Sequence, residues 1–348
     1  MKPPPRMKSA VLRGLRSIEV IDAATPVPGP GQALVQIRAV GICGSDVHYF
    51  VNGRIGGAVV SYPYVLGHEA AGIVAALGSG VTTLSVGTRV VVDPALPCGA
   101  CATCRSGRLN CCQEVRFLGS PPVGGVFEEY HVFQPGQCVP IPEAMSFETA
   151  AMLEPMGVAM HAVNLAGLKL GARAAVMGGG TIGMLTAAAA WRAGASLVAM
   201  TEPVEARRGV AAKFGVDLAL PPGLDGTARI TEATDGVDAA FEAAGSLDAV
   251  DDAIRAVKPG GTVVIIGIPE EDRLQIPVHE ARGKELCLIL VHRSNDTLLP
   301  SIRLISGGRM DPGLVVTHRF PLVRLQEAMN LAHSYEDGVL KAMILMGD

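Results

Sequence analysis

The chain has 348 residues, of which 49% are hydrophobic and 18% are charged, and its formal net charge is −4. This length predicts two domains, the apolar fraction excludes a disordered chain, and 42 glycines without a Gly-X-Y period exclude a collagen. Because no block of lysine and arginine is present, the sequence argues against a general nucleic-acid binder and favours a small-molecule substrate.

The N-terminal part of the chain, residues 1–150, is predicted to be rich in β-strands. Apolar and polar side chains alternate over residues 33–42, which is typical of a half-buried strand, and residues 89–92 form a second apolar run. The N-terminus carries prolines where a signal peptide needs an apolar stretch, so we expect a cytoplasmic protein.

From residue 171 onward, short apolar runs alternate with helical patterns, as in a parallel sheet covered on both faces. The predicted strands are residues 174–177, 197–201, 237–242, 262–266 and 286–291, and the predicted helices are 181–193, 204–214 and 247–257. Two helical patterns and an apolar run follow, at residues 298–305, 322–332 and 342–346. The uncharged segment 174–191 is long enough to suggest a membrane span, but its four glycines favour a buried strand, turn and helix. We therefore expect an α/β fold with a doubly wound parallel sheet and no membrane partner.

A glycine-rich motif, GGGTIG at residues 178–183, follows the first of these strands and opens a predicted helix. In this context Gly178 allows a tight turn, Gly180 lets the backbone approach a pyrophosphate, and Gly183 lets helix and strand pack closely. Glu202 ends the next strand, where a carboxylate can bind the ribose hydroxyls of NAD and repel the extra phosphate of NADP. Arg207 and Arg208 keep NADP open as the alternative, and a purely structural turn is the alternative to a dinucleotide site.

Eight cysteines in a long chain without a secretory signal indicate metal binding or catalysis rather than disulfides. Four of them follow the pattern Cys-x2-Cys-x2-Cys-x7-Cys, which can enclose zinc in a closed tetrahedral site: Cys98, Cys101, Cys104 and Cys112. The spacing predicts structural zinc, with a redox pair or an iron–sulfur cluster as the alternative. Cys111 could be the fourth ligand in place of Cys112.

A second candidate metal site combines Cys43 with His68 and Glu69. One thiol, one imidazole and a carboxylate from separated segments can form a catalytic zinc site, which needs three protein ligands and one exchangeable position. Taken singly, a cysteine is more often a small core residue and a histidine a surface residue.

The stretch Gly67-His68-Glu69-x2-Gly72-x5-Gly78-x2-Val81 resembles the signature of zinc-containing alcohol dehydrogenases in the medium-chain dehydrogenase/reductase superfamily. The segments GICGSDVHY, YPYVLGHEA and VTHRFPL are similar to those of sorbitol (L-iditol 2-) and xylitol dehydrogenases. The resemblance implies a β-rich GroES-like catalytic domain, residues 1–152 with 293–348, which carries both zinc sites. It also implies a Rossmann NAD-binding domain at residues 153–292.

The resemblance also implies the roles of individual side chains. Cys43 and His68 would bind the catalytic zinc, Glu69 is usually described as a further ligand, and Glu154 binds the metal or its water. Ser45 and His48 would pass the alcohol proton to solvent. The implied substrate-binding residues are Tyr49, Phe117, Glu154 and Arg293, with core packing as the alternative for Phe117. The implied cofactor-binding residues are Gly178, Gly180, Ile182, Gly183, Glu202, Arg207, Gly267, Ile268, Val291 and Arg293.

The implied reaction is transfer of a hydride from a secondary hydroxyl of a sorbitol- or xylitol-like polyol to NAD⁺, which gives a ketose. The implied cofactors are two zinc ions per chain, one catalytic and one structural, and NAD. The implied assembly is a homo-oligomer, a dimer or a tetramer. The alternatives are a zinc alcohol dehydrogenase of another specificity (butanediol, threonine or galactitol phosphate) and, in a different class, a non-catalytic dinucleotide-binding protein.

Overall fold

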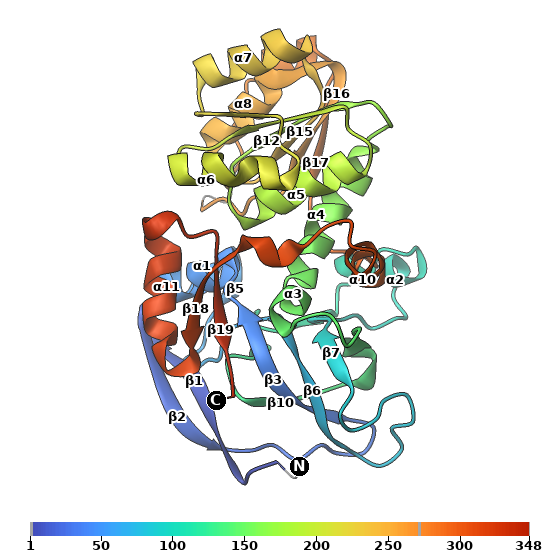
Figure 1. Cartoon of the computed structure of the whole chain (residues 1–348), viewed down its shortest axis with the longest axis vertical. Helices are drawn as coiled ribbons and strands as arrows, with labels where there is room; N and C mark the ends of the chain where they lie inside the picture. Colours follow the sequence, from blue (N-terminus) through green and yellow to red (C-terminus); the bar gives the residue numbers. More distant parts are fainter. Residues whose placement is uncertain (1–2, 271–272, 348) are drawn as a thin grey trace. The chain divides into compact units, whose positions relative to one another are not determined.

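The computed structural model describes residues 3–270 and 273–347 (Figure 1). The chain forms two compact units, one of residues 1–154 and 298–348 and the other of residues 155–297. Within the described ranges, every helix is too short or too polar to cross a membrane.

The first unit is built on a seven-stranded sheet in which β10 (Tyr130–Phe133) pairs with β3 (Ala33–Gly41). The other strands stand in the order β11 (Cys138–Pro140), β7 (Arg89–Val92), β6 (Glu69–Leu77), β3, β19 (Lys341–Leu345) and β18 (Val316–Pro321). The predicted alternation along β3 is confirmed, because Val35 and Ile37 are buried whereas Gln36 and Arg38 are half-buried. The last strand, β19, pairs with β3, so the C-terminal segment belongs to this sheet.

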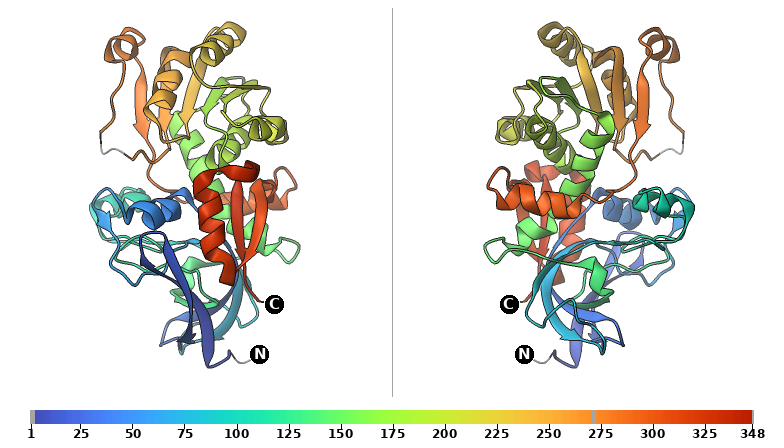
Figure 2. Two further views of the ribbon diagram at one scale, coloured as in Figure 1. Left: turned by 90° about the vertical axis from the view of Figure 1, so that its left-hand side faces the viewer. Right: turned by 90° about the vertical axis from the view of Figure 1, so that its right-hand side faces the viewer.

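Shorter elements complete the first unit. Its two-stranded ribbons are β1 (Arg6–Gly14) with β2 (Ser17–Ala24), β4 (Arg54–Ile55) with β5 (Ala58–Val59), and β8 (Ala95–Leu96) with β9 (Arg116–Phe117). Its helices are α1 (Gly44–Asn52), α2 (Ala102–Arg105), α3 (Phe147–Ala151), α10 (Leu298–Ser306) and α11 (Leu325–Ser334). Helix α11 lies along β18 and β19, as Figure 2 shows, and buries Leu325, Ala328 and Met329 at helical spacing. Helix α4 (Leu153–Ala166) begins in this unit and continues in the second.

The second unit contains a six-stranded parallel sheet. Its strands stand in the order β14 (Leu218–Leu220), β13 (Leu197–Thr201), β12 (Arg173–Met177), β15 (Val237–Glu242), β16 (Val257–Ile265) and β17 (Cys287–Leu290). Numbered along the chain this is the order 3-2-1-4-5-6 of the Rossmann fold, whose switch point lies between β12 and β15. The predicted fold class is therefore confirmed.

Helices α5 (Thr181–Arg192), α7 (Leu224–Thr234), α8 (Leu247–Ala256) and α9 (Val278–Gly283) also belong to this unit. The single helix predicted at residues 204–214 is wrong. The structure has α6 (Glu205–Val210) followed by a 3-10 turn, Ala211–Phe214, which ends at Gly215 with φ +77°. A left-handed glycine after a tightened last turn is a common helix ending, and the hydrophobic pattern does not distinguish this turn from a longer helix.

Candidate active site

Three potential metal ligands converge in the first unit. Cys43 directly precedes α1, Glu69 is the first residue of β6, which pairs with β3, and His68 directly precedes that strand. A sulfur of Cys43, a ring nitrogen of His68 and a carboxylate oxygen of Glu69 all lie within 4.8 Å of one another. His68 and Glu69 are buried, so this cluster of a soft and two harder donors is shielded from most of the solvent.

Asp46, a buried residue of α1, fixes the two segments that carry these ligands. Its carboxylate accepts hydrogen bonds from the backbone N–H of Cys43 at 3.0 Å and of Gly67 at 2.9 Å. One of its oxygens also lies 3.6 Å from Nδ1 of His68. Asp46 therefore holds the thiol and the imidazole side by side, in the way that outer carboxylates orient the ligands of metal sites.

The cluster fits a zinc ion. Nδ1 of His68 is buried and has no hydrogen-bond partner among the residues that the structure describes, and such a nitrogen is costly unless something binds the ring. Burial lowers the pKa of His68, but the charges of Asp46 and Cys43 outweigh it and raise the pKa well above its usual value. Thiolate, imidazole and carboxylate are the donors that zinc prefers, and binding it would replace the proton of the imidazole.

Lys341, at the start of β19, is a residue of this site that the sequence did not indicate. Its ammonium is buried and lies 2.8 and 2.7 Å from the two carboxylate oxygens of Glu69. Burial lowers the pKa of Lys341, but the negative charges of Glu69, Cys43 and Asp46 outweigh this and raise it. A lone lysine before the apolar run 342–346 was the available signal, but only the return of β19 to β3 places it here.

Glu154, in the first turn of α4, is a third buried carboxyl group in this region, after Glu69 and Asp46. Burial raises its pKa to about 7, the charge of His68 opposes the shift, and the charge of Glu69 adds to it. Glu154 forms neither a hydrogen bond nor an ion pair with any residue in the described part of the chain. A buried carboxylate without a partner is suited to bind a cation or a polar ligand.

We expect Glu154→Gln to stabilise the metal-free protein at pH 8. A carboxyl pKa raised above 4.5 favours the protonated form in the folded state, so ionising Glu154 there costs free energy of folding. This cost is absent below about pH 4.5 and complete above about pH 7. Removing it should increase the free energy of unfolding by about 2–3 kcal/mol at pH 8 and by much less at pH 5. Urea unfolding of chelator-treated wild type and variant at both pH values measures this difference. An equal difference at pH 5 and pH 8 would contradict it.

The remaining residues predicted in this unit lie as follows. Ser45 and His48 are half-buried residues of α1. The hydroxyl of Tyr49, also in α1, lies 3.2 Å from Oγ of Ser120. The ring centroid of Phe117 lies 5.5 Å from that of His68, which places this aromatic side chain beside the metal cluster.

The four cysteines of the predicted structural site come together in the same unit. Sulfur atoms of Cys98, Cys101, Cys104 and Cys112 lie within 4.8 Å of one another, with Cys98 and Cys104 4.0 Å apart and Cys101 and Cys112 3.9 Å apart. Zinc–sulfur bonds of about 2.3 Å in a tetrahedron place sulfurs about 3.8 Å apart, so the spacing fits zinc. A hydrogen bond from Thr103 lowers the pKa of Cys101 to about 5, which favours its thiolate. Cys111 is exposed and outside the cluster.

Cys111 and Cys112 are adjacent in the chain but only Cys112 belongs to the cluster, so the two allow a matched test. We expect Cys112→Ser to reduce the zinc content from two ions per chain to one and to lower the melting temperature, because a structural zinc contributes to folding directly. Cys111→Ser should keep both ions and the wild-type melting temperature. Elemental analysis and thermal unfolding of the two variants give the answer, and loss of zinc from the Cys111 variant would contradict the assignment.

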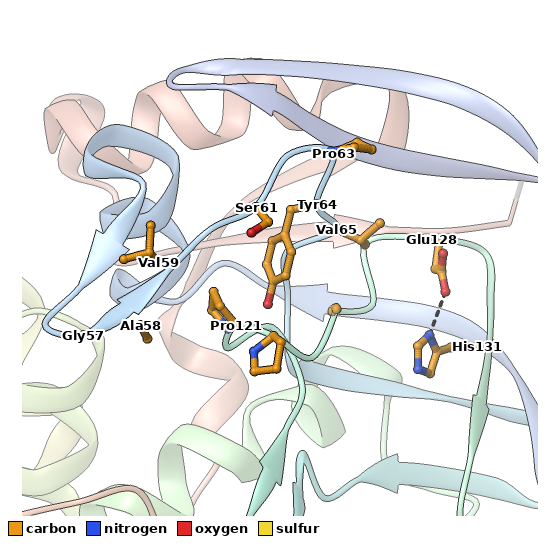
Figure 3. A pocket seen from close by; sticks show the side chains of 13 residues that line it. Gly57, Ala58, Val59, Ser61, Pro63, Tyr64, Val65, Pro121, Glu128 and His131 are labelled. Atoms are coloured by element: carbon orange, nitrogen blue, oxygen red, sulfur yellow. Dashed lines mark hydrogen bonds and ion pairs between the residues drawn. The ribbon is translucent and has the colours of Figure 1, made fainter.

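The first unit also contains a cavity of about 680 Å³ (Figure 3). Its lining includes neither the residues of the two metal clusters nor the other predicted site residues. Tyr64, Pro121, Glu128 and His131 contribute to its walls, and Nδ1 of His131 lies 2.7 Å from Oε1 of Glu128. This histidine and carboxylate are paired with each other and belong to neither of the two metal clusters.

In the second unit, the glycine motif follows β12 and opens α5, as predicted. Gly178 has φ +108°, and a Cβ on Gly183 would lie 1.8 Å from the carbonyl oxygen of Gly178. A Cβ on Gly180 would meet nothing within 4 Å. Two glycines therefore shape the turn itself, whereas Gly180 leaves open space beside the helix N-terminus, where a phosphate can approach free N–H groups.

Glu202 is buried at the end of β13 beside this motif. One carboxylate oxygen accepts a hydrogen bond from the N–H of Gly179 at 2.7 Å and the other from that of Val204 at 2.8 Å. These bonds fix the carboxylate and leave lone pairs for ribose hydroxyls. The guanidinium of Arg208 donates to the carbonyl oxygens of Glu202 and Pro203 at 2.6 and 2.7 Å. Part of the hydrogen-bonding capacity with which Arg208 could bind the 2′-phosphate of NADP is therefore already used by the backbone.

Further predicted cofactor residues also lie in the second unit. Ile182 and Arg207 are in α5 and α6, and Arg207 is buried. A Cβ on Gly267 would lie 2.3 Å from the N–H nitrogen of Gly245, so this turn packs closely on the loop after β15. Ile268 is exposed, Val291 donates to the carbonyl of Ile265, and Arg293 has a left-handed φ of +59°.

In the comparison with known proteins, two family models match separate regions of the chain. Residues 29–143 match the model of the alcohol dehydrogenase GroES-like domain, and residues 181–306 match that of zinc-binding dehydrogenases. A sorbitol dehydrogenase from Bacillus subtilis is 36% identical over 345 residues, which cover 98% of each chain. A D-xylulose reductase A from Aspergillus niger is 34% identical over 89% of this chain and 88% of its own. Among solved structures, an Escherichia coli oxidoreductase of unknown specificity aligns with a TM-score of 0.93 and 31% identity over 99% of this chain and 100% of its own.

Proposed function

Because this chain belongs to the zinc-dependent dehydrogenases of the medium-chain superfamily, we propose that it is an NAD-dependent polyol dehydrogenase. It transfers a hydride from a secondary hydroxyl of a sorbitol- or xylitol-like substrate to NAD⁺ and gives a ketose. The observation that carries this proposal is the buried convergence of Cys43, His68 and Glu69, in a chain that also has a dinucleotide fingerprint. The substrate class is supported by the sorbitol dehydrogenase and D-xylulose reductase relatives.

In this proposal Cys43 and His68 hold the catalytic zinc together with a carboxylate, and the four-cysteine cluster holds the structural zinc. When bound, the catalytic zinc supplies Lewis acidity that favours the alkoxide form of the alcohol near neutral pH. Ser45 and His48 carry the alcohol proton away. Tyr49, Phe117, Glu154 and Arg293 contact the substrate.

The cofactor-binding part of the proposal assigns the pyrophosphate to the glycine motif and the adenosine ribose to Glu202. Six further residues complete the site: Ile182, Arg207, Gly267, Ile268, Val291 and Arg293. The fixed carboxylate of Glu202 favours NAD over NADP, because it would repel a 2′-phosphate. The proposal also includes the domain limits 1–152 with 293–348 and 153–292, a dimeric or tetrameric homo-oligomer, and a cytoplasmic location.

The test uses purified, zinc-replete protein with a panel of polyols and both cofactors. We expect two zinc ions per chain and formation of NADH with sorbitol or xylitol, and much slower reduction of NADP⁺. Oxidation of butanediol, threonine or galactitol phosphate with no oxidation of polyols would overturn the substrate class. Zinc at the four-cysteine site alone, with NAD binding but no turnover of any alcohol, would support the non-catalytic alternative.

A further inference from the structure

Glu242, the last residue of β15, is a buried carboxylate of the second unit. Its Oε1 accepts hydrogen bonds from the backbone N–H groups of Ala244 at 2.7 Å and Gly245 at 2.5 Å. The backbone carbonyl oxygen of the same residue accepts from the N–H groups of Ile266 at 2.8 Å and Gly267 at 3.2 Å. One residue thus binds both the turn that follows β15 and the turn that follows β16.

These two turns pack closely on each other beside the carboxylate. A Cβ on Gly267 would lie 2.3 Å from the backbone nitrogen of Gly245 and 2.6 Å from Oε2 of Glu242. A Cβ on Gly245 would lie 2.7 Å from the carbonyl oxygen of Ile268, and Gly245 has a left-handed φ of +73°. Glycine at both positions therefore allows the two turns to close around the carboxylate.

The place of these turns in the sheet indicates which half of the cofactor they would contact. A dinucleotide lies across the carboxyl ends of the strands at the switch point, with one mononucleotide over each half of the sheet. The glycine motif and Glu202 follow β12 and β13, and the proposed function assigns them to the pyrophosphate and the adenosine ribose. Strands β15 and β16 are the neighbours of β12 on the other side of the switch point (Figure 1). Their turns therefore belong to the nicotinamide half, in which Gly267 and Ile268 are predicted cofactor residues.

We propose that Glu242 is a positioning residue for the nicotinamide half of NAD, because it holds the turns after β15 and β16 in the conformation that receives the nicotinamide ribose. This inference rests on the proposed function, since it requires NAD at the carboxyl ends of these strands. Glu242 does not itself touch the cofactor and acts through the backbone of Gly245, Gly267 and Ile268. Without its carboxylate, the N–H groups of Ala244 and Gly245 lose this acceptor, and the two turns lose the group that lies between them.

The test compares two ligands by titration calorimetry of the zinc-replete protein. NAD⁺ contains both halves of the cofactor, whereas ADP carries the adenosine and both phosphates but neither the nicotinamide nor its ribose. We expect Glu242→Ala to weaken NAD⁺ binding at least about tenfold, because two backbone hydrogen bonds that fix a binding turn are lost. ADP binding should stay within about twofold of wild type, since the glycine motif and Glu202 are unchanged.

Two further variants separate positioning from stability. Glu242→Gln should bind NAD⁺ nearly as tightly as wild type, because its amide oxygen can accept both hydrogen bonds. Its NH₂ group would replace Oε2, which accepts no hydrogen bond from the residues that the structure describes. Asp238→Ala is the matched control at the opposite end of the same strand, where Asp238 accepts from the N–H of Arg173 at 2.7 Å and pairs with Lys258. It should lower the melting temperature but keep the affinities for NAD⁺ and ADP.

Equal weakening of NAD⁺ and ADP binding in Glu242→Ala, or wild-type binding of both ligands, would overturn the role of Glu242. A Glu242→Gln variant that binds NAD⁺ as weakly as Glu242→Ala would also overturn it, since the amide keeps the acceptor. If Glu242→Ala does not fold, Glu242→Asp takes its place, because the shorter side chain withdraws the carboxylate from both N–H groups. Wild-type protein that does not bind NAD⁺ would refute the proposed function itself, and this titration comes before any variant is made.

Discussion

A Cys43→Ser variant is expected to lose the catalytic zinc and to oxidise polyols at least about a thousandfold more slowly, since metal activation contributes several kcal/mol. The reason is the donor set. A serine hydroxyl is not a thiolate, and without it His68 and the carboxylates leave the site one ligand short. Zinc content should fall from two ions to one, and the affinity for NAD⁺, measured by calorimetry, should stay close to that of wild type.

Cys138→Ala provides the control for this experiment. Cys138 is a buried cysteine of the same unit that belongs to neither metal cluster, and burial raises its pKa to about 12. Its replacement should keep both zinc ions and the wild-type rate. Full activity in a Cys43→Ser protein that has lost one zinc would end the assignment of this cluster as the catalytic centre.

The second unit was the more predictable part of the fold, for a physical reason. In a parallel sheet covered on both faces the inner strands are buried along most of their length, so they appear as continuous apolar runs. Strands β13 and β15 therefore have the predicted limits, 197–201 and 237–242. Helix α7 was not predicted, because threonines, glycine and acidic residues make up much of it and Ile230 is the one large apolar side chain among its buried residues, Gly226, Thr227, Ile230 and Thr234.

The two metal clusters differ in how much of each could be predicted from the sequence alone. The four cysteines lie within one short segment, so spacing alone predicts that they come together. Lys341 reaches Glu69 only because β19 and β6 flank β3, and this pairing joins segments that are far apart in the chain. Local patterns carry no information on such a pairing. For the same reason the spacing could not show that Glu69 has a cationic partner, whereas Glu154 forms no ion pair with any residue that the structure describes.

The glycine motif permits a second test with a large effect, this time on folding rather than catalysis. We expect Gly183→Ala to lower the free energy of unfolding by about 1–3 kcal/mol or more, because the new Cβ would lie 1.8 Å from the carbonyl oxygen of Gly178 and overpacking has this cost. The contact is with backbone, so neither α5 nor the turn after β12 can relieve it by rotating a side chain. Urea unfolding measures the loss.

Gly180→Ala is the matched variant, three residues earlier in the same motif. Its Cβ would meet nothing within 4 Å and its φ is −72°, so the free energy of unfolding should stay near that of wild type. If Gly180 is where the backbone meets the pyrophosphate, the added methyl group should instead weaken NAD⁺ binding about tenfold, as a lost close contact of roughly 1.4 kcal/mol would. A Gly180→Ala protein that binds NAD⁺ as tightly as wild type would contradict the assignment of the pyrophosphate to this turn, even if Gly183→Ala is unstable as expected.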